Sequence, residues 1–149
     1  MGTHRYTRRI AASPADAFRV FADPDLVADW MEASRVVDPT GPLDVAGTRF
    51  TLVIRGPWRF TTRVIRSEPG RLYETYATGP LGADYRIVAT LTPLNDGGTS
   101  LDLLMEWTAP LGPIGRWIDR RLVEPEPHTA GNREVDRLVT LATEARADG

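Results

Sequence analysis

The 149-residue chain contains no cysteine and no lysine, and only two histidines, His4 and His128. These absences exclude disulfides, thiolate metal sites, cysteine nucleophiles and lysine Schiff bases. Two histidines are too few for a His-rich metal centre, and we predict neither metal nor cofactor. No apolar run approaches the roughly 20 residues that cross a bilayer. The start of the chain lacks the apolar core of a signal peptide, which predicts a soluble, cytoplasmic protein.

Charge is nearly balanced: 18 basic residues, all of them arginine, face 20 acidic ones, for a net charge of −2. They are spread along the chain without a basic stripe, so we expect no nucleic-acid partner. The use of arginine alone is typical of a GC-rich genome, although a functional preference for arginine would give the same pattern. Twelve prolines and thirteen glycines gather in short clusters, which predicts frequent turns.

The first third of the chain predicts one strand and two short helices. The strand covers Tyr6–Ala12. Ser13 before Pro14 predicts a helix start, because serine caps free N–H groups and proline fits the first helical position. Asp23 before Pro24 repeats this pattern and predicts a second short helix.

The middle of the chain alternates apolar and polar residues and is rich in β-branched and aromatic side chains, as strands are. Six strands are predicted, over Ser34–Asp38, Thr48–Arg55, Trp58–Ser67, Arg71–Thr78, Asp84–Leu94 and Ser100–Thr108. Turn sequences such as RGPW, EPG and NDGG separate them. Such short connections predict an antiparallel meander.

The end of the chain is predicted to be helical, with one break. Leu111–Leu122 can form a helix, and Asn132–Ala147 carries apolar residues on one helical face. Pro125 and Pro127 interrupt the two stretches, because proline removes a helical hydrogen bond. No shift in composition marks a linker, so residues 1–149 are predicted to form a single domain.

This order of elements resembles the START-like, or helix-grip, superfamily (SRPBCC), and within it the polyketide cyclase/dehydrase and lipid-transport-like branch. The resemblance covers nearly the whole chain. Its carriers are IAASPADAFRVFADPDLVADWM at 10–31, EPGRLYETYATGPLGADYRIVATLTPLNDGGTSLDLLMEW at 68–107 and LGPIGRWIDR at 111–120. It implies an α+β helix-grip fold, with a curved seven-stranded antiparallel sheet, two short helices and a C-terminal helix covering a cavity. The proline break departs from the family, whose terminal helix is usually continuous.

The connections between the predicted strands fall at two ends of the sheet. Those near 39–46, 68–71 and 95–98 are ordinary polar turns, whereas those near 31–33, 55–58, 79–82 and 109–114 are unusually apolar. In the family, the cavity opens at this second end. Apolar loops are costly in water unless they have a role. They predict the rim of a pocket for an apolar ligand, or else tips that pack against one another or a second subunit.

Alternation along each strand predicts which side chains face the cavity. The apolar sets are assigned inward, which places Leu72, Glu74 and Tyr76 of the 71–78 strand on the inner face. Aromatic rings with one hydrogen-bonding group suit a mostly apolar ligand with a few oxygens, although plain core packing would also explain each ring. The predicted ligand-binding residues are Trp30, Phe50, Trp58, Leu81, Leu103, Met105, Trp107, Ile114 and Trp117.

Glu74, Tyr76 and Tyr85 are the predicted proton-transfer residues. A carboxylate on an apolar face would have a raised pKa and could act as a general acid or base. A salt bridge from Glu74 to an arginine, or a position at the sheet edge, is the competing interpretation. His128 is a further candidate for proton transfer, although its proline-rich surroundings favour an exposed position.

The resemblance implies three functional hypotheses. The first is a polyketide cyclase/dehydratase-like enzyme that acts, without metal or cofactor, on an apolar, oxygen-bearing biosynthetic intermediate held between sheet and terminal helix. The second is a non-catalytic module that binds or transports a lipid or apolar metabolite. The third is a co-chaperone-like interaction domain that docks through the apolar rim. The chain is expected to be a monomer or a homodimer.

Overall fold

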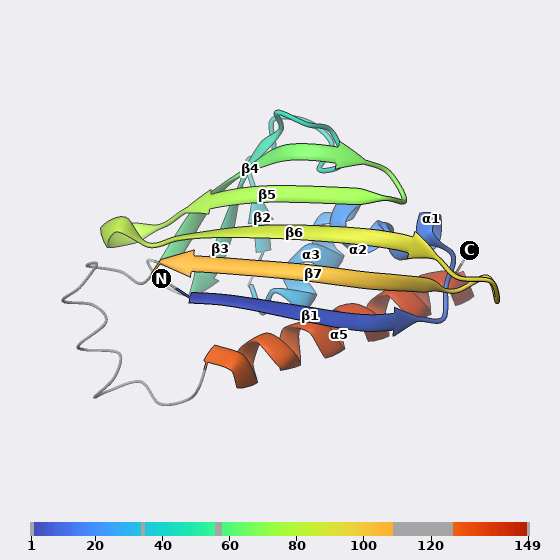
Figure 1. Ribbon diagram of the computed structural model, residues 1–149. Coiled ribbons are helices and arrows are strands. Elements are labelled where there is room, and N and C mark those ends of the chain that lie inside the picture. Colours follow the sequence, from blue (N-terminus) through green and yellow to red (C-terminus); the bar gives the residue numbers. More distant parts are fainter. Residues whose placement is uncertain (1, 34, 56–57, 109–126, 149) are drawn as a thin grey trace.

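A seven-stranded antiparallel sheet with helices on one face forms the molecule (Figure 1). The computed structural model describes residues 2–33, 35–55, 58–108 and 127–148. The sheet order is β1-β7-β6-β5-β4-β3-β2, so the predicted meander is confirmed and the first strand pairs with the last. The elements are β1 (Gly2–Ile10), α1 (Pro14–Ala17), α2 (Arg19–Ala22), α3 (Pro24–Trp30), β2 (Arg35–Val37), β3 (Arg49–Arg55), β4 (Trp58–Glu68), β5 (Leu72–Thr78), the 3-10 turn η1 (Pro80–Gly82), β6 (Asp84–Pro93), β7 (Thr99–Thr108) and α5 (Pro127–Asp148).

Side-chain caps start the short helices where the sequence predicts them. The Ser13 hydroxyl accepts a hydrogen bond from the Asp16 amide at 3.2 Å, and the Asp23 carboxylate accepts one from the Asp25 amide at 2.9 Å. Each cap satisfies one of the N–H groups that a helix start leaves unpaired. Both caps precede a proline at the first helical position. These helices turn the chain back across the concave face of the sheet.

The core lies between this face of the sheet and the helices. Trp30, only 2% exposed, donates its indole N–H to the Val20 carbonyl at 3.0 Å. The Tyr73 ring stacks on Phe21 with centroids 5.1 Å apart, and its hydroxyl donates to the Leu43 carbonyl at 2.7 Å. The buried indole N–H of Trp30 and the buried hydroxyl of Tyr73 thus each have a hydrogen-bond partner. The short helices are fixed on the sheet by these aromatic contacts.

The α5 helix covers the remainder of the concave face and packs against β1, α1 and α3 (Figure 1). Its inward side is formed by Val135, Leu138, Leu141 and Ala142, all buried. The second predicted helical stretch is therefore confirmed, and it begins at Pro127, five residues before the expected start. The helix predicted over Leu111–Leu122 lies outside the described residues. No helix in the described ranges is both long and apolar enough to cross a membrane.

The predicted inner faces are correct for β3, β6 and β7 and wrong for β5. In the sheet, Tyr73 pairs with Ala89, Thr75 with Ile87, and Ala77 with Tyr85. Directly paired residues point to the same face, so Tyr73, Thr75 and Ala77 face inward, with Ile87 and Ala89. The other set, Leu72, Glu74 and Tyr76, faces outward. Both sets contain one tyrosine, so the alternation did not decide the face; packing of the Tyr73 ring on the helices does.

Candidate functional site

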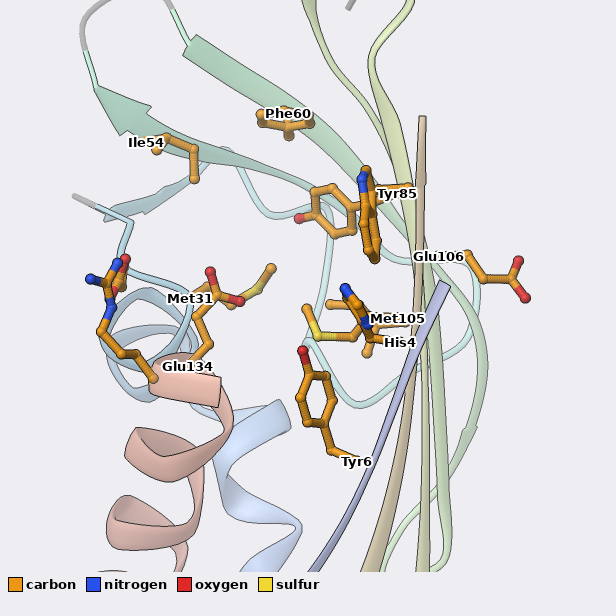
Figure 2. A pocket seen from close by; sticks show the side chains of 13 residues that line it. His4, Tyr6, Met31, Ile54, Phe60, Tyr85, Met105, Glu106 and Glu134 are labelled. Carbon is orange, nitrogen blue, oxygen red and sulfur yellow. The ribbon is translucent and has the colours of Figure 1, made fainter. Parts of the chain in front are cut away.

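A cavity of about 590 Å³ opens between the sheet and the first turns of α5 (Figure 2). Such a volume is within the range of small-molecule pockets. It lies at the end of the sheet where the sequence predicts an apolar rim. Its lining residues are His4, Tyr6, Met31, Glu32, Ile54, Phe60, Tyr85, Ile87, Met105, Glu106, Trp107, Arg133 and Glu134.

One wall of the cavity comes from the paired strands β1 and β7. His4 stacks on Trp107 with ring centroids 4.8 Å apart and an interplanar angle of 30°. The register pairs His4 with Met105 and Gly2 with Trp107. A side chain at position 2 would occupy the space of the Trp107 indole, so this glycine lets the ring lie flat along the wall. The wall therefore presents a flat aromatic surface to a ligand.

Tyr85 and Phe60 continue this wall along the sheet: their ring centroids are 5.3 Å apart, and Tyr85 is the direct cross-strand partner of Trp107. The hydroxyls of Tyr85 and Thr62 are both buried and lie next to each other. Burial raises the pKa of Tyr85 above its usual value; the Thr62 hydroxyl opposes this rise and the charge of Glu134 adds to it. Tyr85 is thus a neutral hydrogen-bonding group in an apolar wall.

Glu134 brings a carboxyl group to the cavity from the second turn of α5. Figure 2 shows its side chain reaching toward Met31 and the space that Tyr6 and Tyr85 also border. Burial and, to a smaller extent, the nearby carboxylate of Glu32 raise its pKa to about 8, against the opposing effect of Arg133. The side chain keeps part of its surface accessible because it faces the open cavity. Near neutral pH it is largely a carboxylic acid.

The charge of Glu134 also affects the tyrosines around it. Burial raises the pKa of Tyr6, the Glu134 charge raises it further, and Arg8 lowers it. Arg133 pairs with Glu32 at 3.4 Å, on the side of the cavity away from the sheet. The site therefore combines an aromatic interior, tyrosine hydroxyls, the neutral carboxyl group of Glu134 and the ion pair of Arg133 and Glu32.

Comparison with known proteins gives a family for this arrangement. The family model described as polyketide cyclase/dehydrase and lipid transport matches residues 1–143. The chain belongs to this family. Family and fold together support a ligand-binding helix-grip domain, as the resemblance implied. The comparison with curated proteins gives no match.

Solved structures confirm the helix-grip fold. Protein CV1439 from Chromobacterium violaceum is 20% identical, with 96% of this chain and 99% of that chain covered and a TM-score of 0.67. Norcoclaurine synthase from Thalictrum flavum is 17% identical, with 96% and 87% covered and a TM-score of 0.63. DynU16, a protein of the dynemicin biosynthetic locus, is 16% identical, with 93% and 46% covered and a TM-score of 0.63. At these identities, the similarity shows the fold alone.

The predicted site residues of this polyketide cyclase/dehydrase family member divide into several groups. Tyr85, Met105 and Trp107 line the cavity. Trp30 and Phe50 are buried and border a separate cavity of about 20 Å³, and Leu103 is fully buried. The other predicted ligand-binding residues do not join them: Trp58 and Leu81 are 40% and 61% exposed and are not among the described lining residues, and Ile114 and Trp117 lie outside the described residues.

Glu74 requires a correction: it lies on the outer face of the sheet, not in the cavity. Its carboxylate accepts hydrogen bonds from the Arg66 Nε at 2.7 Å and the Arg86 Nε at 2.8 Å. Burial alone would raise the pKa of Glu74, but the hydrogen bonds from Arg86 and Arg66 outweigh burial and hold the pKa below its usual value. The salt-bridge interpretation of this residue is confirmed.

Tyr76 requires the same correction. It is 39% exposed on the outer face, and its hydroxyl donates to the Asp84 carboxylate at 2.9 Å. That hydrogen bond raises the pKa of Tyr76, with smaller contributions from burial and from the Asp84 charge. The side chain of His128 lies outside the described part of the chain. The Glu106 side chain points away from the cavity (Figure 2) and pairs with Arg86 at 3.6 Å.

Among the polar lining residues that sequence reasoning missed are His4, Tyr6 and Glu134. Tyr6 begins the predicted first strand, and extending that strand toward the N-terminus would have placed His4 on the same inner face. Glu134 lies four residues before Leu138, which helical spacing places on the same side as the buried leucine. In the described residues, no group of acidic or histidine side chains could hold a metal ion.

Proposed function

We propose that this protein binds an apolar, oxygen-bearing small molecule in the cavity between the sheet and α5 and catalyses its cyclisation or dehydration. The cavity carries the proposal, because its aromatic walls suit a flat apolar ligand and its neutral polar groups suit ligand oxygens. Enclosure would hold a flexible substrate in a reactive conformation and exclude water. Tyr85 remains the proton-transfer residue of this proposal, since Glu74 and Tyr76 face away.

Binding is tested with a neutral naphthyl ketone, 6-propionyl-2-(dimethylamino)naphthalene, whose fluorescence responds to an apolar surrounding. We expect saturable binding that Trp107→Ala weakens about tenfold, because the variant removes the stacked wall, an effect of about 1.4 kcal/mol. Trp58→Ala is the matched control, since Trp58 is exposed and not among the described lining residues. Equal weakening by both variants, or no saturable binding, would contradict the cavity as the binding site.

Catalysis is tested by native mass spectrometry of the protein purified from its own host. A bound molecule that loses one water during incubation, or isomerises to a product separable by chromatography, is the expected result. Tyr85→Phe keeps the ring against Phe60 and removes only the hydroxyl, so we expect the bound molecule to be retained and its conversion to be slowed by about 10²-fold or more. Full conversion by this variant would exclude Tyr85 as the proton-transfer residue.

A passive carrier is the second candidate function. The burial of the Tyr85 hydroxyl favours it, because a hydroxyl buried within the cavity wall is less accessible to a ligand for proton transfer. A bound lipid or metabolite that leaves the protein unchanged, with Tyr85→Phe identical to the unmodified protein, would support this function over catalysis.

A further inference from the structure

The polar groups at the open end of the cavity restrict the class of ligand more than the aromatic walls of the cavity do. Among the described lining residues, the groups able to carry positive charge are Arg133 and the imidazole of His4. Arg133 forms an ion pair with Glu32 at 3.4 Å, and the His4 ring stacks on Trp107. Glu134 has no hydrogen-bond or ion-pair partner among the described residues, yet protein surrounds it on most sides.

An enclosed carboxyl group without a cation is most stable as the neutral acid. Several titratable groups surround Glu134: Glu32 beyond the end of α3, Arg133 on α5 itself, His4 and Tyr6 on β1, and Tyr85 on β6. The carboxylate of Glu32 disfavours a second negative charge beside it, and Arg133 only partly offsets this. Glu134 therefore offers an O–H donor rather than an anion to whatever enters the cavity.

We propose that the Glu134 carboxyl group is the polar anchor of this cavity, which donates a hydrogen bond to the carbonyl oxygen of an uncharged ligand and disfavours ligands carrying a carboxylate or sulfonate. This inference rests on the proposed binding function and narrows its ligand class. An anionic ligand would add a third acidic group beside Glu32 and Glu134, with a single paired arginine to compensate. The oxygen of a neutral ketone or enol can instead accept a hydrogen bond from the O–H group of Glu134.

Three probes of similar aromatic core test the charge preference: the neutral naphthyl ketone, the anion 8-anilinonaphthalene-1-sulfonate and the cation (naphthalen-2-ylmethyl)trimethylammonium. At pH 6.5 we expect the neutral ketone to bind most tightly. Its affinity should fall about fivefold as the pH rises through about 8, because the donor is lost on ionisation and one hydrogen bond contributes about 1 kcal/mol. Preferential binding of the anion, or of the cation at pH 6.5, would overturn the inference.

Two variants isolate the role of Glu134. Glu134→Gln keeps a neutral donor at every pH, so ketone affinity should stay at the pH 6.5 level up to pH 9.5. Glu134→Leu keeps a similar size without a donor, so affinity should be about fivefold lower at every pH. Glu144→Gln, an exposed position on the same helix, serves as the matched control and should retain the pH dependence of the unmodified protein.

The possible outcomes distinguish a failure of the role proposed for Glu134 from a failure of the proposed binding function. Saturable ketone binding whose pH dependence is unchanged in Glu134→Gln would overturn the role of Glu134 and leave the binding cavity standing. Absence of binding by all three probes to the unmodified protein would overturn both. Circular dichroism of each variant verifies folding, and a variant that fails to fold is replaced by a direct ¹³C NMR titration of the Glu134 carboxyl. A titration midpoint in the usual range of glutamate would contradict the inference.

Discussion

At the scale of single residues, two glutamates illustrate how environment decides what a carboxyl group does. Glu74 is buried between Arg66 and Arg86, so it stays ionised and ties β4, β5 and β6 together. Glu134 is enclosed without a cation partner, so it keeps its proton. The same residue type thus stabilises the sheet in one place and presents a donor to the cavity in another.

Glu74→Gln should therefore lower stability without changing ligand affinity. The folded-state pKa of Glu74 is below its unfolded value, so its contribution is complete above the unfolded pKa and disappears as the pH falls through the folded one. We expect the variant to be less stable by about 1–2 kcal/mol at pH 7, since both arginines remain partly exposed. Urea unfolding at pH 7 and pH 3.5 measures this, and the difference between variant and unmodified protein should shrink at the lower pH. A large loss of probe affinity would instead indicate that Glu74 contributes to ligand binding.

At the scale of elements, a short connection between two strands determines where side chains of the cavity wall lie. Gly79 lies between β5 and the η1 turn, and a side chain there would collide with the ring of Phe60. Phe60 in turn packs on Tyr85, so one missing side chain lets both rings take their places in the wall. Gly82, three residues later, is needed for a different reason: it has a φ of +81° and open space around it.

This contrast gives a paired prediction. Gly79→Ala meets no backbone strain but displaces Phe60, so it should change ketone affinity and cost about 1–3 kcal/mol through overpacking. Gly82→Ala forces a side chain into the left-handed region and should cost about 1 kcal/mol while leaving affinity unchanged. Fluorescence titration of both variants measures the ketone affinity, and urea unfolding measures the stability. Equal affinities in the two variants would contradict the role of Gly79 in placing Phe60.

The boundaries of most elements were predictable because the signals for them are local. Serine or aspartate before proline starts the short helices, and clusters of glycine, proline and aspartate end the strands. The structure shifts these predicted strand limits by one residue at most, apart from the first strand. That strand begins at Gly2, earlier than expected, because pairing with β7 draws the polar start of the chain into the sheet.

The site itself was predictable only in part, because it depends on which way each strand faces. Tyr85, Met105 and Trp107 follow from clear alternation in β6 and β7. In β5 the two faces have similar hydrophobicity, and only the packing of Tyr73 under the short helices selects one. Glu134 was missed because a single acidic residue at the edge of an apolar helical face is usually solvated. The depth of the cavity beside α5 is a property of the assembled fold.

At the scale of the whole molecule, α5 is held by two kinds of contact along its length. Near the cavity, Val135 is buried, but the other described contacts are polar: Arg8 on β1 donates to Asn132 at 2.9 Å, and Arg137 forms a bidentate pair with Asp29 at 2.8 and 2.9 Å. Further along, Leu138 and Leu141 are buried in the core. Exposed polar contacts contribute little individually, whereas buried leucines contribute a few kcal/mol each. The cavity end of α5 is therefore the easier end to open.

A ligand in the cavity should make the cavity end of α5 harder to open. If entry requires the first turns of α5 to move from the sheet, amides there exchange with solvent through an opening that also releases the ligand. With free ketone at about 100 times its dissociation constant, such exchange should slow by about a hundredfold, equivalent to about 2.7 kcal/mol. Amides of β2, an edge strand at the other side of the sheet, open without releasing the ligand and should exchange at unchanged rates. Hydrogen exchange with and without ketone tests this, with Trp107→Ala as the control of weakened binding. Equal protection of β2 and α5 would indicate that the ligand is released only when the entire sheet unfolds, and would contradict α5 as the moving element.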